Sequence, residues 1–158
     1  MLTISTDDFL WFVDDCLDAM TEIVTGLGDE LANTAPALPG ANSPYAILTH
    51  CLGVIRWWGG VMIAGHAVDR DRDAEFVATG PVADVPAAVR RAREQLAEDL
   101  TGFDPTAPLA EVPDDRYRDR PYGRNQGAVL VHVFHELAQH LGHMELTRDV
   151  LLSRENGP

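Results

Sequence analysis

Residues 131–145 place four of the six histidines of the chain on a stretch with helical periodicity. Since side chains four residues apart share a face of a helix, His132, Glu136 and His140 form one column, and His143 falls beside it. The neighbouring stripe is apolar and consists of Val133, Leu137, Leu141 and Met144. A column of metal-binding side chains therefore borders the stripe that such a helix buries. Glu136 and His140 can bind one metal ion from a single turn, whereas His135 and His140 point apart and make a poor pair of ligands.

Three further stretches of the chain have helical periodicity. Ser5 or Thr6 caps the first, and Ser43 followed by Pro44 is a strong start signal for the second. Asp84 opens the third, and the fourth begins near residue 125 and carries the histidine column. The expected helices cover about residues 6–26, 44–64, 85–100 and 125–152.

The segments between these helices lack helical periodicity. Residues 26–42 are expected to be a long connection with one short turn around Leu31, and residues 103–124 are a second long connection. Residues 69–73 alternate acidic and arginine side chains and are expected to form a solvated loop. With no convincing strand pattern, four amphipathic helices predict an all-α four-helix bundle. The length fits one domain over residues 1–158.

Charge and composition exclude several classes of partner. The net charge is -13, and no basic run is visible, which argues against nucleic acid. The N-terminal stretch has acidic residues and no basic-then-apolar signal segment, so no export is expected. No uncharged apolar run approaches the roughly 20 residues of a membrane span. Cys16 and Cys51 lie in apolar helical surroundings, as expected of reduced core thiols. These features predict a cytoplasmic protein without a nucleic-acid or membrane partner.

The second helix supplies one more candidate ligand, His50, on its apolar face. If the second and fourth helices face each other, His50 meets Glu136 and His140. Two imidazoles and one carboxylate make three protein ligands. Three is the number in a catalytic zinc site, which leaves a fourth position open. Each part has a simpler explanation, because a single core histidine and a helical acid–base pair are both common. A buried Glu136 needs a counter-charge, however, and a divalent cation supplies one.

These residues resemble the DinB-like (YfiT-like) metalloprotein superfamily. The second helix begins at Ser43-Pro44 and carries His50 ahead of the pair Trp57-Trp58, as in that superfamily. The fourth helix contains Glu-x-x-x-His-Leu-Gly-His from Glu136 to His143. The resemblance is closest to the mycothiol-dependent branch, which includes the metal-binding domain of maleylpyruvate isomerase. Many relatives have His in place of Glu136, whereas the Glu form matches the mycothiol branch.

The resemblance implies a DinB/YfiT-type four-helix bundle, often a homodimer, that holds Zn²⁺ or another divalent ion such as Ni²⁺. By position, the implied metal ligands are His50, Glu136 and His140. Relatives of known activity are S-transferases that use mycothiol, bacillithiol or glutathione. The implied function is conjugation of a low-molecular-weight thiol, mycothiol above all, to a small electrophile in detoxification, with the thiolate activated on the metal.

The expected chemistry needs no protein nucleophile, because a thiol on Zn²⁺ loses its proton near neutral pH. His132 and His143 are candidate catalytic residues that orient the metal ligands or shuttle a proton; alternatively, they only pack or hydrogen-bond within the core. Two other functions stay open at this point. One is a metal-dependent hydrolase on the same site. Glu136 would be a metal ligand and so would not be free to act as a base, which counts against a hydrolase. The other is a non-enzymatic dimeric metal-binding protein of the stress response.

Overall fold

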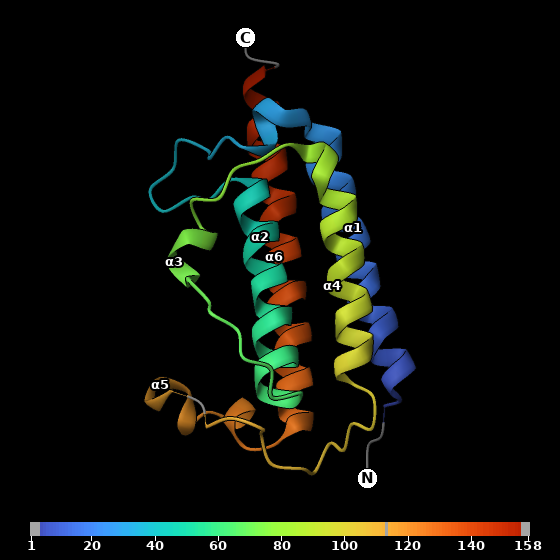
Figure 1. Cartoon of the computed structure of the whole chain (residues 1–158). Coiled ribbons are helices and arrows are strands. Elements are labelled where there is room, and N and C mark those ends of the chain that lie inside the picture. Colours follow the sequence, from blue (N-terminus) through green and yellow to red (C-terminus); the bar gives the residue numbers. More distant parts are fainter. Residues whose placement is uncertain (1–3, 113, 156–158) are drawn as a thin grey trace.

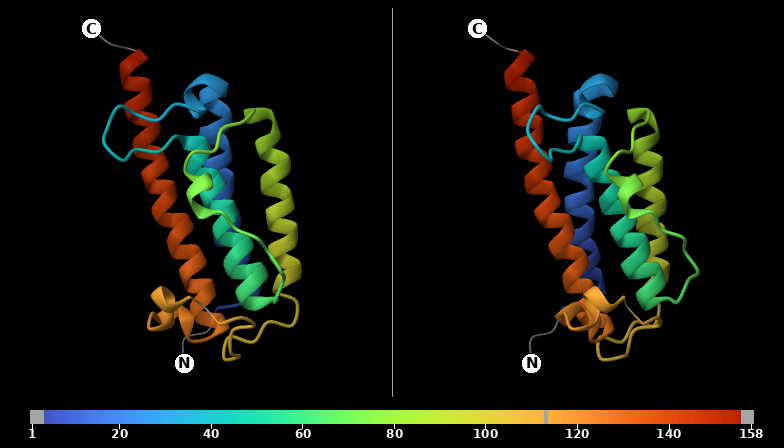
Figure 2. Two further views of the ribbon diagram at one scale, coloured as in Figure 1. Left: turned by 60° about the vertical axis from the view of Figure 1, so that its left-hand side comes forward. Right: turned by 90° about the vertical axis from the view of Figure 1, so that its left-hand side faces the viewer.

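The computed structural model describes residues 4–112 and 114–155. Four long helical segments run alongside one another, as Figures 1 and 2 show. They are α1 (Thr6–Ala32), α2 (Pro44–Ile55) with its continuation η1 (Arg56–Ile63), α4 (Val85–Asp99) and α6 (Gln126–Glu155). Among the described residues there is no strand, so the prediction of an all-α four-helix bundle is confirmed.

The predicted helix starts are confirmed by their caps. The side chain of Ser5 accepts a hydrogen bond from the backbone N–H of Asp8 at 3.0 Å, and Ser43 accepts one from Ala46 at 3.2 Å. Asn125 caps α6 in the same way, through the N–H of Ala128 at 2.9 Å. Near its other end, α1 is interrupted at Gly28, whose φ of 71° departs from the helix, and one more turn follows to Ala32.

The core lies between α6 and its neighbours α1, α2 and η1, while α4 packs against η1 and α1. Three members of the predicted apolar stripe of α6, Val133, Leu137 and Met144, are fully buried, and the fourth, Leu141, is partly buried. The histidine column of α6 therefore lies at the edge of the core, facing α2. Over Arg56–Ile63 the second helix widens into a π-helical turn, in which Ala64 N–H donates to the carbonyl of Gly59 at 3.0 Å.

The connections contain short helices that the sequence pattern did not predict: α3 (Arg72–Glu75), η2 (Val82–Asp84), α5 (Asp115–Arg118) and η3 (Pro121–Gly123). The prediction of a solvated loop over residues 69–73 is wrong in part. The aspartates of this segment are exposed as expected, but Arg70 turns inward and Arg72 already begins α3. Helix α3 lies against α2 (Figure 1), so this connection covers the helix that carries His50.

One helical stretch, Pro44–Ile63, is long and apolar enough to cross a membrane by length and hydropathy alone. Within the structure, however, 72% of its apolar window is buried by the rest of the protein. This burial is the pattern of a helix at the centre of a bundle, which its contacts with α1, α4 and α6 explain.

Candidate metal centre

The structure brings together the three side chains that the sequence selected as metal ligands. His50 on α2 points at α6, and its Nε2 atom lies 3.8 Å from Oε2 of Glu136. The same carboxylate oxygen lies 3.8 Å from Nε2 of His140, one helical turn further along α6. The two imidazole rings meet edge to face, with their centroids 4.8 Å apart. One oxygen and two nitrogens from two helices thus converge on one point.

This arrangement fits a divalent cation. Metal bonds of about 2.0–2.2 Å in tetrahedral geometry hold their ligand atoms roughly 3.3 Å apart. The observed separations of 3.8 Å need only a small closure to reach that value. They are also too long for hydrogen bonds between these atoms.

Two buried ring nitrogens of the group have no hydrogen-bond partner within the described part of the chain. They are Nε2 of His50 and Nδ1 of His140. A buried polar atom without a partner is costly and needs an explanation. For Nε2 of His50, which faces Glu136, a metal ion provides that explanation, and the donor set of two imidazoles and a carboxylate suits Zn²⁺.

The charges around the site favour the protonation states that bind metals. The neighbouring His50 is the main cause that holds the pKa of Glu136 below its usual value, with His132 and His140 adding to the effect and burial opposing it. Burial, reinforced by His50, lowers the pKa of His140. A carboxylate that stays ionised beside an imidazole that stays neutral is the ligand state of a metal site.

On its other edge, His50 is held by a carboxylate that the sequence analysis missed. Its Nδ1 lies 2.8 Å from Oε2 of Glu75, at the end of α3. Glu75 in turn accepts two hydrogen bonds from Arg70, one from Nε at 2.6 Å and one from the terminal nitrogen at 2.8 Å. Phe76 stacks on the imidazole of His50, with ring centroids 4.4 Å apart. The connection between η1 and α4 therefore encloses this ligand.

Gly53 makes the contact with Glu75 sterically possible. A Cβ atom at this position would lie 2.6 Å from Cδ of Glu75, closer than real Cβ contacts come. Gly53 lies one turn after His50 on α2, so the missing side chain leaves space beside the imidazole. The sequence thus contained one signal for a close neighbour, a glycine near a candidate ligand. That neighbour belongs to the same chain, so Gly53 gives no support to a dimer surface on α2.

The two histidines predicted as catalytic candidates lie on either side of the centre. His132 is close to the other oxygen of Glu136, with Nδ1 3.9 Å from Oε1, and its ring stacks on Tyr122 at 3.9 Å. Burial is the main cause that lowers the pKa of His132. The ring of His143 lies 6.1 Å from that of His140. His135 also approaches Oε1 of Glu136, at 4.0 Å, so His132, His135 and Glu136 form a second, more exposed group of metal-binding types.

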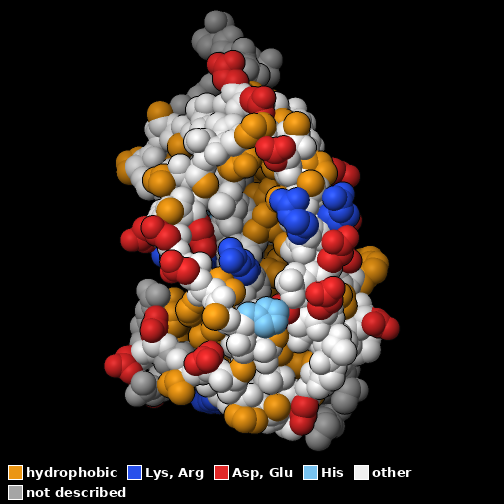
Figure 3. Space-filling model, in the orientation of Figure 1, with side chains coloured by type: hydrophobic (Ala, Val, Ile, Leu, Met, Phe, Trp, Pro, Cys, Tyr) orange, Lys and Arg blue, Asp and Glu red, His pale blue; other side chains and the backbone are white. Residues whose placement is uncertain are grey.

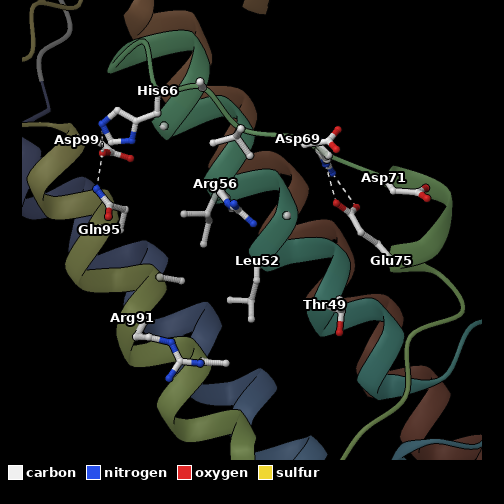
Figure 4. A pocket seen from close by; sticks show the side chains of 18 residues that line it. Thr49, Leu52, Arg56, His66, Asp69, Asp71, Glu75, Arg91, Gln95 and Asp99 are labelled. Carbon is white, nitrogen blue, oxygen red and sulfur yellow. Dashed lines mark hydrogen bonds and ion pairs between the residues drawn. The ribbon is translucent and has the colours of Figure 1, made fainter.

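Two cavities flank the centre. One of about 520 Å³ lies between η3 and α6 and is lined by Glu136, His132, His135 and Tyr122. Of the three candidate ligands, only Glu136, whose side chain is 23% exposed, lines this cavity. The larger cavity, of about 830 Å³, lies between α2 and α4 and reaches Glu75 and Gly53 but none of the three candidate ligands (Figure 4). The larger cavity is therefore separated from the candidate centre by the His50–Glu75 pair.

The chain matches one known protein family over most of its length. The family described as mycothiol-S-transferase matches residues 8–152, which is nearly the whole chain and includes His50, Glu136 and His140. No curated protein and no solved structure matches the chain. The extent of the family match is decisive: the chain belongs to the mycothiol S-transferase family, within the DinB/YfiT-like superfamily.

Proposed function

We propose that this protein, acting as one DinB-like domain over residues 1–158, is a metal-dependent S-transferase that conjugates mycothiol to a small electrophile. The observation that carries the proposal is the convergence of His50 Nε2, Glu136 Oε2 and His140 Nε2, of which the first is buried without a partner. The family match supplies the reaction class and the thiol.

In this proposal His50, Glu136 and His140 are the metal ligands. A divalent ion held there, Zn²⁺ first and Ni²⁺ as another that suits these donors, would stabilise the thiolate form of a bound thiol at neutral pH. Glu136 contributes the negative charge that balances the cation, and the neutral imidazoles contribute lone pairs. With three protein ligands, one coordination position is left for the substrate.

The cavity between η3 and α6 is the proposed binding site for the two substrates. Tyr122, Pro121 and Val131 give it an apolar wall, and Arg120 lies at its edge. This wall would hold the carbon skeleton of an electrophile next to Glu136, whereas the sulfur of mycothiol reaches the centre. The thiolate then forms a carbon–sulfur bond while the leaving group takes the electron pair of the bond that breaks. His132, which lines this cavity beside Glu136, would orient the carboxylate. His143, on the other side of His140, would orient that imidazole.

The test is a metal analysis combined with a conjugation assay. Purified protein should contain about one divalent ion per chain and should accelerate the reaction of mycothiol with monobromobimane, in which sulfur displaces bromide. His140→Ala should lose both the ion and the acceleration, and His66→Ala, a histidine outside the centre, should keep both. Metal binding without conjugation of any low-molecular-weight thiol would refute the transferase. Ester or amide cleavage without added thiol would point to a hydrolase instead. We also propose a cytoplasmic homodimer, which gel filtration and fractionation of cells would test.

A further inference from the structure

We infer that Glu75, held by Arg70, is a positioning residue that fixes the tautomer and the orientation of His50 toward the metal. The inference rests on the proposed metal centre, because it concerns how one of its ligands is presented. An ionised carboxylate can only accept hydrogen bonds, so Nδ1 of His50 must carry a proton where it meets Glu75 at 2.8 Å. In the neutral ring, the lone pair is then on Nε2, the atom that faces Glu136.

The orientation of Glu75 is itself fixed. Arg70 donates two hydrogen bonds to the carboxylate, one to each oxygen, and such paired contacts define both distance and angle. Both partners are largely shielded from solvent, with side chains 13% and 10% exposed. Phe76 stacks on the imidazole, and the missing side chain of Gly53 lets the carboxylate lie close to α2. Both contacts keep the imidazole and the carboxylate together. The chain Arg70–Glu75–His50 thus leads from the surface to the metal-facing nitrogen.

The first measurement uses metal-free protein. Long-range ¹H–¹⁵N spectra at neutral pH should show His50 with its proton on Nδ1, with the signal assigned by its absence in His50→Gln. In Glu75→Gln this preference should weaken, while Glu94→Gln, an exposed carboxylate on α4, should leave it unchanged. A His50 tautomer that is the same in wild type and Glu75→Gln would overturn the inference, whether or not the protein binds a metal.

The second measurement is zinc affinity, determined by competition with a chelator. Glu75→Gln should bind zinc about 10-fold to 100-fold more weakly, which is the usual effect of removing an outer partner of a ligand. Arg70→Met, which leaves Glu75 in place, should give a smaller loss in the same direction, and Glu94→Gln should give none. Thermal unfolding of each variant separates this effect from misfolding. Unchanged zinc affinity in folded Glu75→Gln would contradict the inference, whereas a wild type that binds no zinc would refute the metal centre and leave the tautomer test valid.

A separate observation concerns the larger cavity, between α2 and α4. Arg56 and Arg91 point into it from opposite walls (Figure 4), and neither guanidinium has a hydrogen bond or ion pair among the described residues. Arg56 and Arg91 are both exposed, whereas the buried charges of the cavity are already engaged: Glu75 with Arg70, and Asp99 with Gln95 and His66. The space-filling view shows arginine and hydrophobic side chains around the hollow on this face (Figure 3).

We propose that this cavity binds an organic anion with an apolar body, such as an aromatic or aliphatic carboxylate. Its apolar lining comes from Leu52, Ile55, Val68, Ala88 and Ala92. Within the described ranges both guanidinium groups lack a protein partner, although acidic side chains are in excess in a chain of net charge -13. Guanidinium groups pair well with carboxylates, and the volume of about 830 Å³ accepts a molecule of drug size.

Fluorescence titration with anilinonaphthalene sulfonate, an apolar anion, tests this site. Arg56→Ala combined with Arg91→Ala should weaken binding about tenfold or more, because charge-assisted hydrogen bonds are lost. Arg90→Ala, which removes an exposed arginine paired with Glu94 on the same helix, should leave the affinity unchanged. Equal affinity of the double variant and wild type, or equally tight binding of the uncharged analogue phenylnaphthylamine, would overturn the proposal.

Discussion

The two imidazoles of the candidate centre are held in different ways. His140 lies on α6, one turn from Glu136, so the helix itself sets the distance between them, and its Nδ1 has no partner in the described part of the protein. His50 reaches the centre from α2 and is fixed by Glu75, Arg70 and Phe76, all from the following connection. One half of the centre therefore depends on helix geometry, and the other depends on a tertiary contact.

The difference shows where such a site is vulnerable. Backbone hydrogen bonds maintain the spacing of Glu136 and His140 as long as α6 is folded. The orientation of His50 depends on a segment of short elements, which can shift without unfolding the bundle. Substitutions in residues 70–76 should therefore impair the centre while sparing the fold, as the Glu75→Gln and Arg70→Met variants test. Four further predictions concern the two halves of the centre and the core thiols, from the largest expected effect to the smallest.

The largest effect is expected for Glu136→Ala, because both imidazoles face this carboxylate. Zinc affinity should fall by more than the roughly 10–100-fold that an outer partner contributes, since a ligand and the compensating charge are both lost. Chelator competition measures the loss, and circular dichroism should show an intact bundle. Retention of stoichiometric zinc would mean that the two halves do not share Glu136.

The next effect is that of Gly53→Ala, which acts only on the half that contains His50. The added Cβ would displace the carboxylate of Glu75, so zinc affinity should fall about tenfold. An alanine in an unobstructed helix would stabilise by about 1 kcal/mol relative to glycine, but here the clash should cancel that gain. Unchanged zinc affinity together with a raised Tm would show that Glu75 can accommodate the added Cβ without losing its contact with His50.

Gly142→Ala is the matched control on the other half. Gly142 lies inside α6, two residues after His140, and a Cβ there would meet nothing within 4 Å. The free energy of unfolding should therefore rise by about 0.5–1 kcal/mol, with zinc affinity unchanged. Urea denaturation and the same chelator titration provide both values. A loss of zinc affinity here would contradict the view that the helix alone maintains the spacing of Glu136 and His140.

The smallest effect is expected from thiol reagents. Cys16 and Cys51 are buried, and burial is the main cause that raises the pKa of both thiols. Native protein should therefore resist iodoacetamide at neutral pH and keep its activity, and both cysteines should react after unfolding. Mass spectrometry counts the modified thiols. Rapid alkylation of Cys51 with loss of conjugation would point to a protein nucleophile beside His50.

The sequence was informative wherever the relevant spacing is local. The first cap at Ser5 or Thr6, the cap at Ser43, the helix start near residue 125 and the spacing of Glu136 and His140 are local features. The structure has them as predicted, with Ser5 as the first cap. The sequence left the facing of the second and fourth helices as a condition, and in the structure α2 and α6 are in contact. The apolar stripes on both helices bring His50 to the edge of the core, where it meets the pair on α6.

Glu75 could not be predicted, because its pairing with His50 spans 25 residues of sequence and depends on how a connection folds back. In the sequence, residues 69–75 show only alternating charges, which are typical of a solvated loop. The same limit applies to the π-helical turn over Arg56–Ile63, since no local pattern distinguishes it from the α-helix it continues. Gly53 was the one local sign, and it indicated a close neighbour without identifying it.

The central claim is that His50, Glu136 and His140 hold one divalent ion with a position left for a thiol. The most direct test is the absorption spectrum of cobalt-loaded protein titrated with mycothiol. The account predicts one cobalt ion per chain, and a sulfur-to-cobalt charge-transfer band that grows with mycothiol and is absent in His50→Ala. A cobalt site whose spectrum does not change with mycothiol, or one that survives in His50→Ala, would contradict it.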